Sequence, residues 1–421
     1  IIVIKLGDIH SFWTLLMIIC MYNTGTNMLR ECLLSCLACK REDFEIIIVD
    51  DGSSKDYSDL LAEFGSVKYY KTQRQGTLKA RIFGAKHATG DYVCYVDSDD
   101  TVSPIYHIAS LKRAEDTNAD IVLNDWAFRT LKSTFICSHD ETLATDIVAT
   151  GSEIMERFMR QRGLQHAYYV LWNKLFRREI LLASVEEIER LNLDKMSFAE
   201  DMLISFFAFS KARVLVNTHV GHYYYRIHDG QQTAMQSEKK YITQITNQAT
   251  VFDAMKNKLL ELGLFEKYEK DFAAWMQLLA CTHYAKVMGS SYKSLIPLIR
   301  EKYDGCKLKK NFKGASKYYD YHIVFPLNYV EIDRAIYYIY SASQPVKINK
   351  KMGRYAKREL CGLEKCFEKK YEIVRTGETY TFPKEKYKKT QLLVHSHFLY
   401  KVGTILFPQG SKLRKILKSR L

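Results

Sequence analysis

A short apolar run that ends in a group of carboxylates is the feature that most constrains the fold of this 421-residue chain. Residues 92–96, Tyr-Val-Cys-Tyr-Val, have the aromatic and branched character of a strand, and Asp97, Ser98, Asp99 and Asp100 follow directly. Because side chains alternate along an extended chain, Asp97 and Asp99 leave the strand end on the same side. Paired carboxylates there suit Mg2+ or Mn2+, which also bind phosphate oxygens. An acidic turn without a ligand is the competing interpretation.

The N-terminal third of the chain alternates between expected strands and helices, which is typical of a parallel α/β sheet. A helical pattern takes over from residue 240 and continues to about residue 340, so the sequence predicts an α/β domain followed by a largely helical region. The expected strands are residues 15–21, 45–50, 67–71, 92–96 and 120–123, and the expected helices are 27–39, 58–64 and 78–87.

Polar groups follow three of the expected strands. They are Tyr22-Asn23, Asp50-Asp51 and Asp97-Ser98-Asp99. Ligands of open parallel sheets bind at the carboxyl ends of the strands, so the coincidence predicts a ligand site there. The chain has neither G-x-G-x-x-G nor G-x-x-x-x-G-K-[ST], which disfavours a dinucleotide site or a P-loop.

Charge divides the chain unevenly. Residues 346–421 hold 20 Lys and Arg against 6 Asp and Glu, which accounts for the whole net charge of +14. The hydrophobic content of 47% and charged content of 26% are those of a soluble globular protein. We therefore predict three regions: a catalytic domain over 1–235, a helical region over 236–345 and a basic region over 346–421.

The last eleven residues have the pattern of a basic amphipathic helix. Leu413, Ile416, Leu417 and Leu421 share one helical face, with Lys and Arg around it. Such a helix lies on an anionic membrane surface, packs as a partner helix, or remains a solvated tail. We favour membrane-surface attachment. No fold signature supports nucleic-acid binding.

The chain also carries signals about its compartment. Its ten Cys occur without a signal peptide, which predicts a reducing compartment without a disulfide framework. Cys32, Cys36 and Cys39 lack the partners of a tetrahedral metal site. The apolar run 9–22 is too short to cross a membrane. We expect a cytoplasmic protein, peripheral on the inner face of the membrane.

Six motifs in order carry a resemblance to a known family. The sequence resembles the inverting family 2 glycosyltransferases of the GT-A fold (Rossmann-like), most closely bacterial enzymes that build capsular or other surface polysaccharides. The resemblance covers roughly residues 15–235. The motifs are Ile-Ile-Cys-Met-Tyr-Asn at 18–23, Ile-Val-Asp-Asp-Gly-Ser at 48–53, 90–100, Trp-Asn-Lys-Leu-Phe-Arg at 172–177, Glu200-Asp201, and Tyr-Tyr-Tyr-Arg-Ile-His at 223–228.

The resemblance implies a nucleoside-diphosphate-sugar donor, with UDP favoured. By resemblance, Asp97 and Asp99 form the D-x-D element that holds Mn2+ or Mg2+ on the diphosphate, with Ser98 beside the donor. Asp51 resembles the contact to the base or ribose, although an N-cap or Asx turn competes. Tyr22 resembles the residue that stacks on the base, and Arg81 the basic residue near the diphosphate. Simple packing and a surface ion pair, respectively, are the alternatives for those two.

The acceptor side is implied by the later motifs. Glu200-Asp201 resembles the acidic pair in which Asp201 is the base that deprotonates the acceptor hydroxyl, and a helix start accounts equally for two acids there. Trp172 and Lys174 resemble the segment below the acceptor site, with core burial competing for Trp172. The third metal ligand implied is His228, unless it faces solvent.

The sequence departs from the family pattern at two positions, where Cys20 replaces a usual Pro and Ile82 follows Arg81 in place of Asn. Neither change affects a residue to which the chemistry is assigned. The function predicted is metal-dependent inverting transfer of a sugar from a nucleoside diphosphate to a hydroxyl of a glycan or lipid-linked acceptor. The alternatives are a nucleotide- or glycan-binding module without turnover and a nucleotidyltransferase.

Overall fold

The computed structural model describes residues 13–38, 44–103, 106–129, 134–135, 146–163, 166–193, 196–226 and 237–309. Contacts divide the chain into two compact units. Residues 11–126 and 139–321 form the larger one, which holds the expected site residues. The other comprises residues 1–10, 127–138 and 322–421, of which 127–129 and 134–135 are described.

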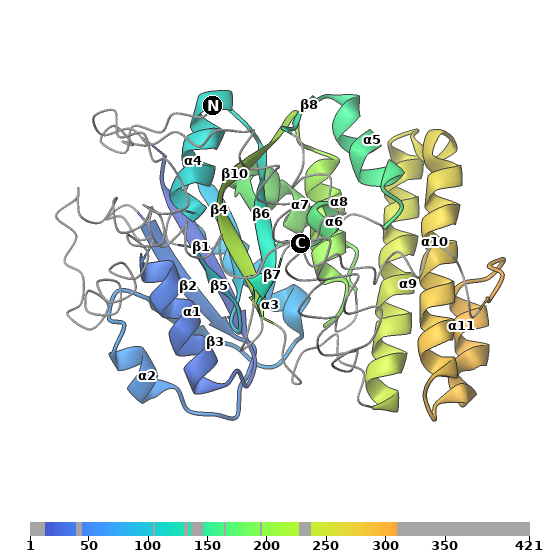
Figure 1. Cartoon of the computed structure of the whole chain (residues 1–421), viewed down its shortest axis with the longest axis horizontal. Helices are drawn as coiled ribbons and strands as arrows, with labels where there is room; N and C mark the ends of the chain where they lie inside the picture. Colours follow the sequence, from blue (N-terminus) through green and yellow to red (C-terminus); the bar gives the residue numbers. More distant parts are fainter. Residues whose placement is uncertain are drawn as a thin grey trace, which may run out of the picture. The chain divides into compact units, whose positions relative to one another are not determined.

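A ten-stranded sheet organises the described residues, and its strands run in the order β3-β2-β1-β4-β9-β6-β10-β5, with β7 on β6 and β8 on β10 (Figure 1). The bounds of the strands are β1 Leu15–Met21, β2 Phe44–Asp50, β3 Lys68–Lys71, β4 Tyr92–Asp97, β5 Thr101–Val102, β6 Ile121–Arg129, β7 Thr134–Phe135, β8 Val148–Thr150, β9 Lys174–Arg177 and β10 Val214–Arg226.

The sheet is parallel from β3 to β4 and contains antiparallel pairs beyond β4. Strands β3, β2, β1 and β4 pair in parallel, whereas β9 runs antiparallel to both β4 and β6. The apolar runs of β1 and β4 are buried, as expected for strands covered on both faces. The predicted fold class, an α/β sheet flanked by helices and followed by a largely helical region, is confirmed.

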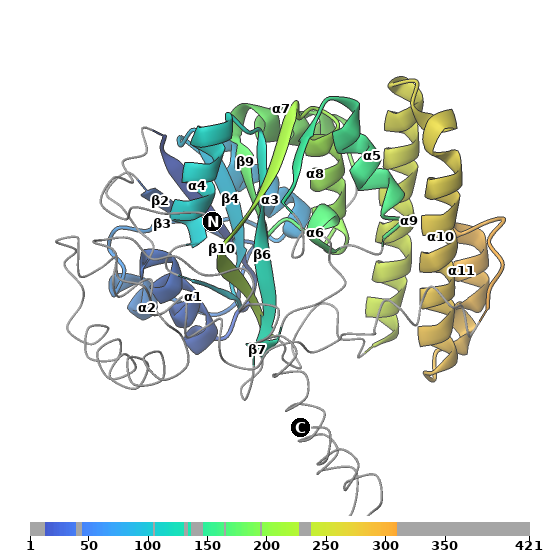
Figure 2. The same ribbon diagram turned by 45° about the horizontal axis from the view of Figure 1, so that its top comes forward.

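Helices cover both faces of this sheet (Figures 1 and 2). Helices α1 and α4 contact strands β5 and β10, whereas α3 and α7 contact β1, β2 and β4 on the other face. Helix α3 approaches β1 closely, because a Cβ on Gly84 would lie 2.4 Å from Cγ2 of Ile18. The bounds are α1 Thr26–Ala38, α2 Ser58–Ala62, α3 Thr77–Lys86, α4 Tyr106–Thr117, α5 Ser152–Arg160, α6 His166–Tyr169, α7 Arg178–Arg190 and α8 Glu200–Phe209.

The predicted helical region begins as two long helices side by side, α9 (Glu238–Glu261) and α10 (Phe265–Met288) (Figure 2). A turn at Gly263, whose φ of 66° suits glycine, divides them. The 3-10 turn Lys293–Leu295 and α11 (Ile296–Lys302) follow. One cluster of buried side chains continues from the sheet into these helices, where Trp275 packs 5.9 Å from Phe158 between ring centroids.

Two expectations from the sequence concern the remainder of the chain. The helical pattern after residue 309 and the basic region 346–421, with its amphipathic C-terminal segment, lie outside the described residues. Among the residues that are described, none of the helices combines the length and apolar character needed to span a bilayer.

Candidate active site

The polar groups predicted from the sequence come together at one edge of the sheet. Strand β1 lies between β2 and β4, and the parallel register pairs Met21 with Asp50 and Cys20 with Asp97. Tyr22, Asp51 and Ser98 therefore follow three adjacent strands at their carboxyl ends. This edge is the usual ligand position of an open α/β sheet.

Tyr22 lies open at this edge, with 37% of its surface exposed. The Arg74 guanidinium carbon stands 3.5 Å from the centroid of its ring, a cation–π distance. The next residue, Asn23, adopts a left-handed φ of 51°, and its side-chain oxygen accepts from the backbone N–H of Ser54 at 3.0 Å. The turn thus holds Tyr22 outward, with one face of its ring covered by Arg74.

The two aspartates after β2 take different roles. Asp50 Oδ1 accepts from the N–H of Ser53 at 2.8 Å, and its Oδ2 accepts from the Tyr69 hydroxyl at 2.6 Å. Asp51 accepts from the N–H groups of Gln75 and Gly76 at 2.7 and 2.9 Å. The side chain that accepts a hydrogen bond within the local Asp-Asp-Gly-Ser turn is therefore that of Asp50, and not that of Asp51. Asp51 instead fixes the loop that leads into α3 and carries Arg74.

Asp97 is paired with a buried arginine. Arg81, on α3, donates from Nη2 to Asp97 Oδ1 at 3.0 Å, and its Nη1 lies 3.4 Å from Oε1 of Glu200 on α8. Burial raises the pKa of Asp97 to about 6, against the opposing effect of Arg81 and with Asp99 and Asp201 adding to the rise. Burial would lower the pKa of Arg81, but Glu200, Asp97 and Asp201 together raise it, so this side chain stays charged.

Arg81 thus joins two motifs that are far apart in the sequence. Its guanidinium contacts the first carboxylate of the D-x-D element and the acidic pair at the start of α8. The sequence places Arg81 near a diphosphate by resemblance, but it gives no sign of the Glu200 contact. The alternative of a surface ion pair is excluded, because Arg81 is only 5% exposed.

Glu200 and Asp201 occupy the first turn of α8, as the sequence predicts. Ala199 precedes them with a left-handed φ of 62°, and Asp201 Oδ1 accepts from the N–H of Met202 at 2.8 Å. Burial raises the pKa of Glu200 to about 7 despite Arg81, and Asp201 adds to the rise. Burial also raises the pKa of Asp201, opposed by Arg81, the Met202 bond and Lys174. A carboxylate with a raised pKa is a stronger base at neutral pH.

The pKa of Glu200 gives a pH dependence of stability. This pKa rises on folding from 4.5 to about 7, so the folded protein binds a proton that the unfolded chain loses between those values. Stability should therefore fall as pH rises through that window and level off above it. We expect Glu200→Gln not to show this decline. The free energy of unfolding of the variant, measured by urea titration, should therefore rise relative to that of wild type between pH 5 and pH 7.5. Glu266 is an exposed glutamate in the first turn of α10, and Glu266→Gln controls for the loss of one negative charge. A stability difference between Glu200→Gln and wild type that stays constant with pH would contradict the raised pKa of Glu200.

Ser98 is buried, with its hydroxyl 2.7 Å from that of Thr24 after β1. Cys20, at the position of the usual Pro, lies beside Arg81. Burial raises the pKa of its thiol to about 12, so the thiol is neutral there.

Trp172 and Lys174 are both buried, and for Trp172 core burial was the alternative considered from the sequence. The Trp172 ring stacks on Tyr223 at 4.5 Å between centroids and 19° between planes. Lys174 is 0% exposed, and its ammonium donates to the carbonyls of Ala167 and Val170 and to Oδ1 of Asn173. Both side chains are therefore packed in the interior, where their contacts stabilise the segment that leads into β9.

A buried tyrosine and a third aspartate complete the D-x-D turn, and the sequence assigned a role to neither. The Tyr223 hydroxyl donates to Asp100 Oδ2 at 2.7 Å and accepts from the N–H of Asp97 at 3.0 Å. Asp100 is 1% exposed, and its Oδ1 accepts from the N–H of Arg226 at 2.6 Å. The only sequence signal was that both residues stand inside matched motifs.

The residues present fit a cation held partly by substrate. In the described part of the chain, no group of three or more His, Cys, Asp and Glu could hold a metal ion by itself. Asp97 and Asp99 follow the same strand end, and a cation bound by one or two carboxylates together with substrate phosphates is the usual arrangement for Mg2+. His228, the third predicted ligand, lies outside the described residues.

Comparison with known proteins gives a consistent result. The glycosyl transferase family 2 model matches residues 17–183. EpsH and EpsJ of Bacillus subtilis (strain 168), both described as glycosyltransferases, are each 29% identical over 220 and 217 residues respectively, or 50% of this chain. The match spans 60% of the length of each relative, less than two thirds. A crystal structure of S. aureus TarS 1-349 aligns with 72% of this chain and 89% of its own length, at 16% identity and a TM-score of 0.41.

Proposed function

We propose that this protein transfers a sugar, with inversion, from a nucleoside-diphosphate sugar to a hydroxyl of a glycan or lipid-linked acceptor. The match of residues 17–183 to the glycosyl transferase family 2 model supports the proposal. The observation that carries the proposal is the cluster of Asp97, Arg81, Glu200 and Asp201, in which Arg81 and Glu200 are buried and the two aspartates partly exposed. It brings the D-x-D element and the acidic pair of α8 to one place. UDP is the favoured nucleotide, and surface polysaccharide is the favoured product.

The donor occupies the carboxyl edge of β1, β2 and β4 in this proposal. The base stacks at Tyr22, whose ring is exposed, and the loop fixed by Asp51 closes the other side of the base site. Ser98 lines the floor of the donor site. Asp97 and Asp99 would hold Mn2+ or Mg2+, which would supply positive charge against the leaving diphosphate.

Asp201 removes the proton from the acceptor hydroxyl as that oxygen attacks the anomeric carbon on the face opposite the diphosphate. Two features favour the ionised form of Asp201 at neutral pH. They are its place in the first turn of α8 and the positive charge of Lys174, which acts to lower the pKa of Asp201. Glu200 keeps Arg81 between the two sides of the site. Trp172 and Lys174 support the acceptor side by holding the chain before β9.

Membrane-surface attachment through the C-terminal basic region remains part of the proposal. It rests on the amphipathic pattern of residues 411–421 and on the concentration of positive charge after residue 346. Attachment there would place the enzyme beside a lipid-linked acceptor while the donor arrives from the cytoplasm.

Removal of the metal tests the donor side. We expect EDTA to lower the release of nucleoside diphosphate by at least about a hundredfold, with excess Mn2+ restoring it, because the leaving group loses its counter-charge. Asp97→Asn should show the same loss without rescue, measured by coupled detection of the nucleoside diphosphate.

The exposed Asp59→Asn variant on α2 is the control for loss of one aspartate, and it should match wild type. Full turnover in EDTA would refute metal dependence and leave Arg81 as the remaining counter-charge for the diphosphate.

A further inference from the structure

One buried hydroxyl links the D-x-D turn to the strand that lies beyond it. Tyr223, on β10, is 0% exposed. Its oxygen accepts from the N–H of Asp97 at 3.0 Å and donates to Asp100 Oδ2 at 2.7 Å. The turn itself closes with a bond from the N–H of Asp100 to the carbonyl of Asp97 at 3.0 Å. The hydroxyl therefore fixes both ends of the four-residue segment 97–100, which contains Asp99.

Asp100 extends this link to the end of β10. Its second oxygen accepts from the N–H of Arg226 at 2.6 Å, and the Arg226 side chain pairs with Glu31 on α1 at 2.7 Å. The ladder between β5 and β10 adds backbone support, with Tyr223 opposite Val102 and Tyr224 opposite Thr101. A carboxylate buried to this degree persists because its oxygens are hydrogen-bonded.

The ring of the same tyrosine contacts the acceptor-side motif. It stacks on Trp172 at 4.5 Å, and the Tyr106 hydroxyl donates to the Trp172 carbonyl at 3.1 Å. Hydroxyl and ring thus act on two different motifs. Phenylalanine keeps the ring and removes only the hydroxyl, so the two roles can be separated.

We propose that Tyr223 and Asp100 are positioning residues that hold Asp97 and Asp99 in the arrangement needed to bind the cation and the diphosphate. This inference rests on the proposed function. Neither side chain is exposed enough to touch substrate, so each acts through the D-x-D turn. The hydroxyl is the shared element, because it is bonded to the backbone of Asp97 and to the side chain of Asp100.

The test measures binding of Mn2+ together with UDP by isothermal titration calorimetry, beside turnover, in the full chain. Outer-shell partners of metal ligands contribute about 10- to 100-fold to affinity or activity. We therefore expect Tyr223→Phe to weaken Mn2+–UDP binding at least tenfold. Asp100→Asn should do the same, and the double variant should be no worse than either single one, because the residues act as one unit.

Tyr92→Phe is the matched control. Tyr92 is also 0% exposed on the same strand as Asp97, but at its amino end, where its hydroxyl donates to the carbonyl of Ala119 at 2.6 Å. It should lose similar thermal stability and keep Mn2+–UDP affinity. Equal affinity in Tyr223→Phe, Tyr92→Phe and wild type would overturn the inference.

The two proposals fail differently. Wild type that binds Mn2+–UDP but transfers no sugar contradicts the proposed function, whereas the affinities still decide the role of Tyr223. Wild type that transfers sugar at the same rate as Tyr223→Phe contradicts only the positioning role. Wild type that binds Mn2+ with none of UDP, GDP and CDP contradicts both.

Discussion

Asp201→Asn should lower the rate of sugar transfer by about a thousandfold, within the range that a positioned general base contributes. The carboxylate stands in the first turn of α8, and burial raises its pKa against the opposing effect of Arg81. An amide of the same shape can keep the contact with the N–H of Met202 but cannot take a proton. The loss should therefore appear in kcat at saturating donor, while the affinity for nucleotide stays unchanged by calorimetry.

Glu266→Gln is the control for this substitution, since Glu266 occupies the first turn of α10 and lies exposed. It reports the effect of removing an acid from a helix start. A rate within a few-fold of wild type for Asp201→Asn, a loss much smaller than a general base provides, would show that another group deprotonates the acceptor. Glu200 is the neighbouring acid in the same cluster, where it forms an ion pair with Arg81, so Glu200→Gln would be the next variant to examine.

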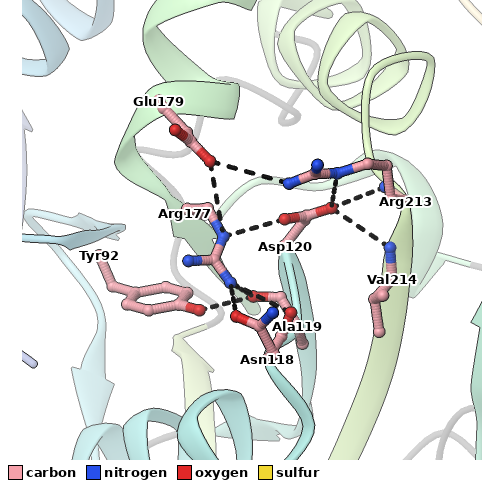
Figure 3. A network of polar contacts seen from close by, with 8 residues as sticks. All are labelled: Tyr92, Asn118, Ala119, Asp120, Arg177, Glu179, Arg213 and Val214. Atoms are coloured by element: carbon pink, nitrogen blue, oxygen red, sulfur yellow. Dashed lines mark hydrogen bonds and ion pairs between the residues drawn. The ribbon is translucent and has the colours of Figure 1, made fainter.

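Arg177→Met should lower the free energy of unfolding by about 3 kcal/mol, the lower end of the cost of breaking a buried ion pair. Only the exposed Arg213, whose Nε lies 3.6 Å from Oδ2, would still face the buried Asp120 carboxylate. Arg177 Nε donates to Asp120 Oδ1 at 2.9 Å, and the two side chains are 10% and 2% exposed (Figure 3). Asp120 Oδ2 accepts from the N–H of Arg213 at 2.7 Å. The guanidinium also lies 5.2 Å from the Tyr92 ring centroid. Urea unfolding followed by circular dichroism measures the loss.

An exposed pair provides the comparison. Arg160 contacts Glu156 at 2.9 Å within α5, with 63% of its side chain exposed. Arg160→Met should cost at most about 0.5 kcal/mol, the usual range for such helix pairs. A similar cost for Arg160→Met and Arg177→Met would contradict the structural role of the buried network. The network lies at the amino end of β4, away from Asp97, so folded Arg177→Met should keep its kcat.

The parallel half of the sheet was predictable because each strand is a continuous apolar run with its own flanking signals. Strands β1, β2, β3 and β4 begin and end within one residue of their predicted bounds. The strands beyond β4 were largely not predicted. Only part of β6 was expected as a strand, and β9 and β10 are separated in the chain from the partners that make them strands. Such pairing is decided by tertiary contacts, which a local pattern does not contain.

In the candidate site, too, local sequence patterns predicted some features, whereas others depend on tertiary packing. Tyr22, Asp51 and Asp97 were predicted at one edge because the carboxyl ends of parallel strands meet there. The contact between Arg81 and Glu200 depends on how α3 and α8 pack, and no local signal records it. Lys174, which the resemblance assigned to the segment below the acceptor site, is buried, and it can be because neighbouring carbonyls accept hydrogen bonds from its ammonium.

The measurement that tests the central claim most directly is the release of free nucleoside diphosphate from UDP-, GDP- and CDP-sugars by the purified full chain with Mn2+. We expect the protein to release nucleoside diphosphate from one of these three classes of donor. EDTA should abolish this release, and the Asp97→Asn and Asp201→Asn variants should lack it. Nucleotide binding without release from any donor, even with candidate glycan and lipid-linked acceptors present, would contradict this expectation and indicate a binding module on the same fold.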